Sequence, residues 1–270
     1  MIKLIALDMD GTLLNSNHKI TDEVKSAIQE AKQNGIKVVL CTGRPLVGVR
    51  PYLEELNLLD EDDYVITFNG ALIQKAKNEE VISHQTLTFE DYVDLVALSE
   101  KLGLHIHMED EQYMYTPNKN IGRYTVHESS LTSMPLRYRS LDETDRNIEV
   151  SKVMFVDDPN LLAQQMEKIP ESFYQRFEIV LSTPYFLEFL HPKASKGNAL
   201  HQLADTLHLK QEEVMAVGDN LNDLSMIQYA GMGIAMGNAA QPAKDAAQHI
   251  TKTNDEHGVA YAIQTWALNK

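Results

Sequence analysis

The stretch Leu4-Ile5-Ala6-Leu7-Asp8-Met9-Asp10-Gly11-Thr12 decides how the rest of the chain is interpreted. Its first four residues are apolar without alternation, which is typical of a parallel strand buried on both faces. Two carboxylates follow where the strand ends, and their i, i+2 spacing directs both side chains the same way. Gly11 permits a sharp turn, and the exposed N–H groups of such a turn can hold a phosphate. The stretch therefore predicts a reactive site at the end of the first strand.

The carboxylates of Asp8 and Asp10 suit phosphoryl transfer. Asp8 can attack phosphorus, while Asp10 can protonate the leaving oxygen and later deprotonate the attacking water. The backbone N–H of Met9 is placed to bind a phosphoryl oxygen. Taken alone, these residues also fit an acidic turn before a loop. The hypothesis is therefore a catalytic aspartate pair, and the alternative is an ordinary acidic turn.

A second polar segment, Thr42-Gly43-Arg44-Pro45, follows an apolar run at 36–41. A hydroxyl and free N–H groups at a strand end, with a proline suited to a first helical turn, indicate an anion pocket at a helix N-terminus. A capped loop with a surface arginine is the alternative.

The third segment is Lys196-Gly197, which opens a predicted helix. A helix N-terminus already carries partial positive charge, so a lysine there is electrostatically misplaced unless an anion binds beside it. A solvated surface lysine is the alternative.

The fourth segment, Gly218-Asp219-Asn220-Leu221-Asn222-Asp223, also follows an apolar strand. Carboxylates at 219 and 223 suit Mg²⁺, which prefers oxygen ligands and shares them with water and a substrate phosphate. Asn222 can donate a hydrogen bond to a phosphoryl oxygen or to Asp8. The alternative is an Asp- and Asn-rich helix cap.

The alternation of strands and helices predicts an α/β fold with a doubly wound, mostly parallel sheet, whose strand ends bring the four segments to one edge. Residues 1–85 and 183–270 form this core, including a helix that Thr21 can cap. Residues 86–182 have a different character: Thr88 and Asp91 form a capping-box pattern, and paired strands are expected at 105–108 and 113–115. We interpret 86–182 as an inserted α+β domain.

The four segments, in this order, resemble the motifs of the haloacid dehalogenase (HAD) superfamily phosphatases. Over essentially its whole length the chain is similar to the Cof-type branch, and most similar to the YidA type of sugar-phosphate phosphatase. Phe68-Asn69-Gly70-Ala71 and Tyr185-Phe186-Leu187-Glu188 are further matches.

The resemblance implies a Rossmann-like HAD core, an aspartyl-phosphate on Asp8 and a general acid/base at Asp10. It implies Mg²⁺ bound by the Asp8 carboxylate, the Asp10 carbonyl and Asp219, with Asp223 supporting the metal through water. The implied phosphate ligands are Met9 N–H, Thr42, Gly43, Lys196 and Asn222. The insert would be a cap that closes over a small phosphorylated metabolite, and the resemblance implies a sugar phosphate.

The composition limits the other function classes. The formal net charge is −15, which disfavours binding to nucleic acid or to an anionic membrane. Cys41 is the single cysteine, and the apolar run 2–7 is too short for a signal or membrane helix, so a cytoplasmic enzyme is expected. The sequence does not decide between a monomer and a homodimer.

Two other functions use the same residues. A phosphotransferase or mutase would pass the phosphoryl group from Asp8 to a sugar hydroxyl. A non-catalytic module would only bind a phosphorylated ligand, although it has no need of a second carboxylate for proton transfer.

Several conspicuous residues fit structural roles better than catalytic ones. Cys41 ends an apolar run and is expected to be a buried small hydrophobe. His105 and His107 have no third ligand nearby in sequence, and Tyr113, Tyr115 and Tyr124 are expected to pack in the insert. The pattern does not tell which of Lys119, Arg123, His107 or Arg137 faces a substrate.

Overall fold

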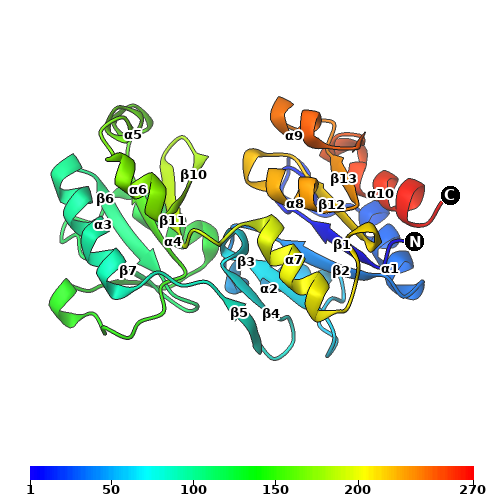
Figure 1. Cartoon of the computed structure of the whole chain (residues 1–270), viewed down its shortest axis with the longest axis horizontal. Helices are drawn as coiled ribbons and strands as arrows, with labels where there is room; N and C mark the ends of the chain where they lie inside the picture. The colour runs from blue at the N-terminus through cyan, green and yellow to red at the C-terminus, as the bar shows by residue number, and fades with distance from the viewer. The chain divides into compact units, whose positions relative to one another are not determined.

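The computed structural model describes residues 1–270 and divides the chain into two compact units (Figure 1). The core unit comprises residues 1–43, 50–83 and 195–270, and the inserted unit comprises residues 44–49 and 84–194. The sequence predicts an insert from 86 to 182, whereas the long segment of the inserted unit runs from 84 to 194. No helix is long and apolar enough to cross a bilayer.

The core unit is built on an eight-stranded sheet in the order β14-β13-β12-β1-β2-β3-β4-β5. Every pair from β14 to β3 is parallel, and β3 and β4 are antiparallel. The mostly parallel sheet that the strand and helix pattern predicts is therefore confirmed. The strands are β1 (Leu4–Leu7), β2 (Lys37–Cys41), β3 (Tyr64–Thr67), β4 (Leu72–Lys75), β5 (Val81–His84), β12 (Val214–Gly218), β13 (Met232–Ala235) and β14 (His249–Ile250).

Strand β1 lies in the centre of this sheet, and all four of its residues are buried. Helices α7 (Lys196–Thr206) and α8 (Leu224–Tyr229) pack on the face that carries Leu4 and Ala6. Burial of these apolar side chains contributes roughly 25 cal/mol per Å². The remaining helices of the unit are α1 (Asp22–Gln33), α9 (Gln241–Ala246) and α10 (Gly258–Ala262), and α2 (Leu46–Glu55) begins among the residues assigned to the inserted unit.

Helix α1 illustrates how the sequence pattern becomes packing. Its buried residues are Val24, Ala27, Ile28 and Ala31, as the helical spacing predicts. Gly35, at φ +76°, follows its end in a conformation that glycine adopts without strain. Thr21 occupies the N-cap position, but its side chain makes no capping hydrogen bond and lies 3.0 Å from His257 Nδ1 instead.

The register of the central strands brings the predicted segments together. Leu7, the last residue of β1, lies opposite Leu40 of β2 and Val217 of β12. The chain leaves the sheet at the same edge after each of these strands. Asp8, Thr42 and Asp219 therefore start from adjacent strand ends, as expected for a ligand site of an open parallel sheet.

The inserted unit has its own six-stranded sheet in the order β10-β11-β9-β6-β7-β8. Phe186–Leu190 forms β11, which pairs with both β9 and β10. These pairings extend the inserted unit to Ala194. Its strands are β6 (His105–Glu109), β7 (Met114–Thr116), β8 (Leu136–Tyr138), β9 (Lys152–Val156), β10 (Glu178–Thr183) and β11.

Four helices complete the inserted unit: α3 (Phe89–Leu102), α4 (Arg123–Thr132), α5 (Pro159–Met166) and α6 (Glu171–Arg176). The capping box predicted at the start of α3 is present, since Thr88 accepts from Asp91 N–H and the Asp91 carboxylate accepts from Thr88. A single apolar core joins α3 and α5 to the sheet and includes Phe155 and Phe189, whose ring centroids lie 4.5 Å apart.

Candidate active site

Lys196 joins two aspartates at the end of the central strands. Its Nζ donates to Asp8 Oδ1 and to Asp223 Oδ1, each over 2.6 Å. The side chain of Lys196 is 0% exposed, which rules out the alternative of a solvated surface lysine. A buried ammonium is stable only when it is paired, and here two charged partners hold it.

Asp219 and Asp223 form the opposite side of this cluster. Asp223 Oδ2 accepts from the backbone N–H groups of Asp219 at 2.8 Å and Asn220 at 3.0 Å. Asp223 thus holds its own loop through one oxygen and Lys196 through the other. Asp219 Oδ1 accepts from the Thr12 hydroxyl at 2.8 Å, a contact across 207 residues that connects the loops after β1 and β12.

Two glycines make room for these carboxylates. A Cβ at Gly218 would lie 2.5 Å from the Asp223 Cβ, and a Cβ at Gly11 would lie 2.5 Å from Asp219 Oδ2. Gly11 also adopts φ +84°, which disfavours any other residue. The glycines in both motifs are therefore required by close approach to the acidic side chains.

The start of α7 positions the lysine. Ser195 is the N-cap residue, and its hydroxyl accepts from Asn198 N–H at 3.1 Å. Gly197 N–H donates to Ser225 Oγ at 3.0 Å, and a Cβ at Gly197 would lie 2.4 Å from the Ser225 carbonyl oxygen. Lys196 is thus fixed between its own helix and the start of α8.

The electrostatics of the cluster leave an excess of negative charge. Burial raises the pKa of the Asp8 carboxyl well above its usual range, and Asp223 raises it further, whereas Lys196 opposes this shift. Burial followed by the charge of Asp223 likewise raises the pKa of Asp219. Burial alone would lower the pKa of Lys196, but Asp223 and Asp8 outweigh it and raise this pKa.

A divalent cation fits this set of donors. Asp8, Asp219 and Asp223 can each offer a carboxylate oxygen, and these atoms lie within 4.8 Å of one another. Three carboxylates with one lysine leave two negative charges when all are ionised, which is the charge that one Mg²⁺ would balance. All-oxygen ligands are those that Mg²⁺ prefers.

The remaining predicted residues lie on the loops that follow the same central strands. The Asp10 side chain is exposed, and the Met9 and Thr42 side chains are buried. Asn222 Nδ2 donates to Asn69 Oδ1 at 3.0 Å, so the asparagine of the fourth segment contacts the one in Phe68-Asn69-Gly70-Ala71. A Cβ at Gly43 would approach the Asn69 amide to 3.1 Å, which places Gly43 beside the same pair.

Three contacts in this site have no signal in the local sequence: Thr12 to Asp219, Asn69 to Asn222 and Gly197 to Ser225. In each case a common polar residue gains its role from a partner on another loop. Asn69 adopts φ +53°, a left-handed conformation that asparagine tolerates, and its occurrence before glycine is the one local hint.

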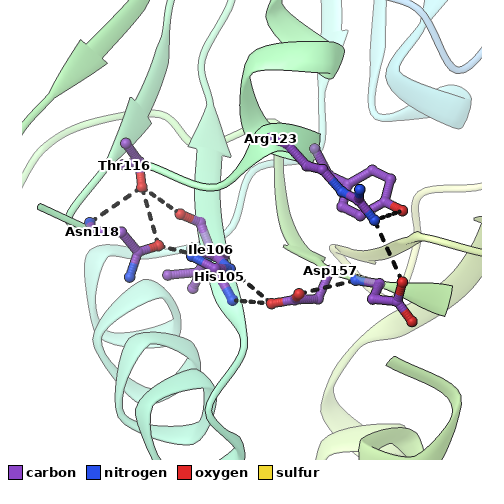
Figure 2. A network of polar contacts seen from close by, with 8 residues as sticks. His105, Ile106, Thr116, Asn118, Arg123 and Asp157 are labelled. Atoms are coloured by element: carbon purple, nitrogen blue, oxygen red, sulfur yellow. Dashed lines mark hydrogen bonds and ion pairs between the residues drawn. The ribbon is translucent and has the colours of Figure 1, made fainter. Parts of the chain in front are cut away.

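Most of the conspicuous residues take structural roles. Cys41 is buried, and burial raises the pKa of its thiol, as expected for an inert side chain. His105 Nδ1 lies 2.7 Å from Asp157 Oδ2, and Figure 2 shows this pair within a polar network of the inserted unit. His107 is fully buried 3.4 Å from Glu109.

The aromatic residues of the insert pack with one another and with arginines. Tyr124 stacks on Tyr185 with 4.9 Å between ring centroids, and the Arg137 guanidinium lies 3.5 Å from the centre of the Tyr113 ring. Arg123 donates to the Tyr124 hydroxyl at 2.9 Å (Figure 2). These contacts agree with the packing roles expected for the tyrosines.

Comparison with known proteins adds independent evidence. A family model described as haloacid dehalogenase-like hydrolase matches residues 5–263. YxeH of Bacillus subtilis is 49% identical over 270 residues, which is 100% of both chains. The Bacillus subtilis protein YcsE, named 5-amino-6-(5-phospho-D-ribitylamino)uracil phosphatase, is 35% identical over 99% of this chain and 96% of its own.

Among solved structures, the HAD subclass IIB sugar phosphatase BT4131 is similar with a TM-score of 0.81 and 27% identity, covering 98% of this chain and 99% of its own. The likeness therefore includes both the core unit and the inserted unit. Several of its relatives are named as phosphatases, and the chain belongs to the haloacid dehalogenase-like hydrolases.

Proposed function

We propose that this protein is a Mg²⁺-dependent phosphatase that hydrolyses phosphate monoesters of small polyhydroxylated metabolites, sugar phosphates above all, through an aspartyl-phosphate on Asp8. The observation that carries the proposal is the Asp8 carboxylate at the end of β1, held by Lys196 on one side and grouped with Asp219 and Asp223 on the other. A carboxylate fixed in this way can attack phosphorus with little loss of side-chain freedom.

The roles of the neighbouring residues follow from their charges and positions. Asp8 would attack the phosphorus atom and the ester oxygen would leave, taking a proton from Asp10. Asp10, which is exposed at the turn after Met9, would next take a proton from the water that attacks the aspartyl-phosphate. Lys196 would remain protonated throughout and stabilise charge on the transferring group.

The proposed metal ligands are the Asp8 and Asp219 carboxylates and the Asp10 carbonyl, with Asp223 acting through bound water. When bound, Mg²⁺ would neutralise charge on the phosphoryl oxygens and help to orient the phosphate. The grouping of the Asp8, Asp219 and Asp223 carboxylate oxygens within 4.8 Å of one another supports this assignment. Met9 N–H, Thr42, Gly43 and Asn222 would supply the other phosphate contacts.

The substrate class is supported by two relatives. YcsE is named for a phosphorylated ribityl compound, and BT4131 is named a sugar phosphatase. Sugars and ribityl groups both carry several hydroxyl groups. A phosphate ester of such a polyhydroxylated compound is therefore the substrate class that we propose.

The test is a release assay for inorganic phosphate, run with Mg²⁺ against sugar phosphates, sugar-alcohol phosphates, nucleotides and an aryl phosphate. Asp8→Asn should abolish release while the far-ultraviolet circular dichroism is unchanged. Asp22→Asn is a matched control, because the Asp22 side chain is 97% exposed and belongs to none of the four predicted segments. Phosphate transfer to a second sugar without release of inorganic phosphate would identify a phosphotransferase or mutase instead. Tight ligand binding with no turnover of any ester would identify a binding module.

A further inference from the structure

A second group of potential metal ligands lies in the inserted unit, apart from the aspartate cluster. It consists of His84, Glu111 and Glu149, and one ligand atom of each lies within 4.8 Å of the others. The three residues come from the end of β5, the turn between β6 and β7, and the segment before β9. No feature of the proposed phosphatase chemistry uses them.

His84 is the buried member of the group. Its side chain is 8% exposed, and its Nε2 lies 3.0 Å from the Ser151 hydroxyl. Its other nitrogen, Nδ1, is directed toward Glu111 Oε1 at 3.4 Å and Glu149 Oε2 at 3.9 Å. When Nε2 donates to Ser151, the lone pair of the neutral ring lies on Nδ1, on the side of the two carboxylates. Metal-binding histidines are commonly oriented by such a bond from the second nitrogen.

Backbone hydrogen bonds hold the supporting segments in place. Leu87 N–H donates to the Val150 carbonyl at 2.9 Å, and Ser151 N–H donates to the Glu109 carbonyl at 2.8 Å. Asp110 Oδ1 accepts from the N–H groups of Gln112 and Tyr113, which fixes the turn that carries Glu111. The three ligands thus stand on a hydrogen-bonded framework rather than on a loose loop.

The charges of the group favour a cation. Glu111 and Glu149 place two carboxylate oxygens on the Nδ1 side of the imidazole, so one nitrogen and two oxygens are available as ligands on the same side of the group. Glu111 and Glu149 are 35% and 73% exposed, so a metal ion can reach them from solvent.

We propose that His84, Glu111 and Glu149 form a binding site for a transition-metal dication of the Zn²⁺ type. Ligand atoms about 2.1 Å from a tetrahedral Zn²⁺ lie about 3.4 Å apart. The separation of His84 Nδ1 from Glu111 Oε1 has this value, and Glu149 needs only a small side-chain movement to match it. One coordination position is left for water.

This site and the aspartate cluster differ in the metal that they prefer. An imidazole nitrogen suits Zn²⁺, Co²⁺ or Ni²⁺, whereas Mg²⁺ prefers the all-oxygen set at Asp8, Asp219 and Asp223. A bound Zn²⁺ would connect three segments that are distant in sequence, including the end of β5 at His84. The proposal stands independently of the substrate and of the phosphatase mechanism.

The experiment is isothermal titration of the whole protein with Zn²⁺ in a large excess of Mg²⁺, which occupies the aspartate cluster. We expect one Zn²⁺ per chain, bound at least tenfold more weakly by Glu149→Gln and by His84→Ala. Glu149 is largely exposed, so its substitution leaves folding intact even if His84→Ala does not fold. His201→Ala is the matched control: His201 Nε2 lies 3.5 Å from Asp205, but both side chains are exposed and no third ligand is grouped with them. Its Zn²⁺ affinity should equal that of the wild type.

Three results would overturn the proposal. The first is no Zn²⁺ binding in excess Mg²⁺, and the second is unchanged affinity in Glu149→Gln. The third is loss of Zn²⁺ binding in Asp219→Asn with binding retained in Glu149→Gln, because Zn²⁺ would then occupy the aspartate cluster. Co²⁺ absorption provides a second readout, since ligation by His84 should give visible bands that His84→Ala lacks.

Discussion

The Lys196 ammonium lies 2.6 Å from the Asp8 carboxylate, with both side chains buried at the end of the central strand β1. Asp223 binds the same ammonium at the same distance. This ion pair joins Asp8, the proposed nucleophile, to the Lys196 ammonium, which stabilises the Asp8 carboxylate in the folded protein. Stability and activity are therefore expected to depend on the same contact.

Lys196→Met should abolish phosphatase activity and reduce the free energy of unfolding by about 3–5 kcal/mol, because two buried carboxylates lose their partner. Urea unfolding and phosphate release measure the two effects. Added Mg²⁺ should restore part of the stability, since it also balances the carboxylates. Lys77→Met is the control, because the exposed Lys77 to Glu61 pair contributes little to stability. Equal losses in the two variants would contradict this account.

Thr12→Val should weaken the response to Mg²⁺ without unfolding the protein. The Thr12 hydroxyl orients Asp219, and loss of a hydrogen bond to a metal ligand typically costs about 10–100-fold in metal affinity. The Mg²⁺ concentration for half-maximal activity should rise accordingly, while activity at saturating Mg²⁺ changes little. Thr206→Val removes an exposed hydroxyl that bonds only its own helix, and should leave the Mg²⁺ dependence unchanged. An unaltered Mg²⁺ requirement in Thr12→Val would contradict the proposal that Asp219 binds the metal.

Glu109 should make the stability of the inserted unit depend on pH. Burial raises its pKa to about 7 from an ordinary value of 4.5, despite the opposing charge of Lys152. The folded protein therefore holds the Glu109 proton more tightly than the unfolded chain. The resulting stabilisation is complete below pH 4.5 and is lost as the pH rises through about 7.

The size of this effect is bounded by about 3–4 kcal/mol, since the pKa rises from 4.5 to about 7 and one pKa unit corresponds to about 1.4 kcal/mol. Glu109→Gln has no proton to lose at this position, so it does not lose this stabilisation as the pH rises. The free energy of unfolding of Glu109→Gln minus that of the wild type should therefore increase between pH 4.5 and 7. Chemical unfolding at several pH values measures the difference, with the exposed Glu100→Gln as control. A constant difference across this range would show that Glu109 does not titrate there.

The sequence predicted the parts of the fold that depend on local pattern. Continuous apolar runs correctly indicated β1 and β12, because parallel strands covered on both faces cannot alternate. The spacing in α1 and the capping box of α3 were equally local signals. The position of Lys196 at a helix start indicated a bound anion nearby, whereas its burial between Asp8 and Asp223 had no local signal.

The pattern did not contain the pairing of distant segments. Phe186–Leu190 has the composition of a buried strand in either unit, and only its ladder to Lys152–Val156 places it in the inserted sheet. The bonds from Thr12 to Asp219 and from Asn69 to Asn222 join residues 207 and 153 positions apart. Such contacts depend on how loops leave the assembled sheet, and periodicity carries no information about them.

The central claim is that the phosphoryl group passes through Asp8. The most direct measurement is to mix the protein and Mg²⁺ with a radiolabelled sugar phosphate, quench in acid within the first turnover, and locate the label by peptide mass spectrometry. The account predicts a base-labile phosphate on Asp8, absent when Asp8→Asn is used. Release of inorganic phosphate by Asp8→Asn at the wild-type rate, or a label on any other residue, would contradict it.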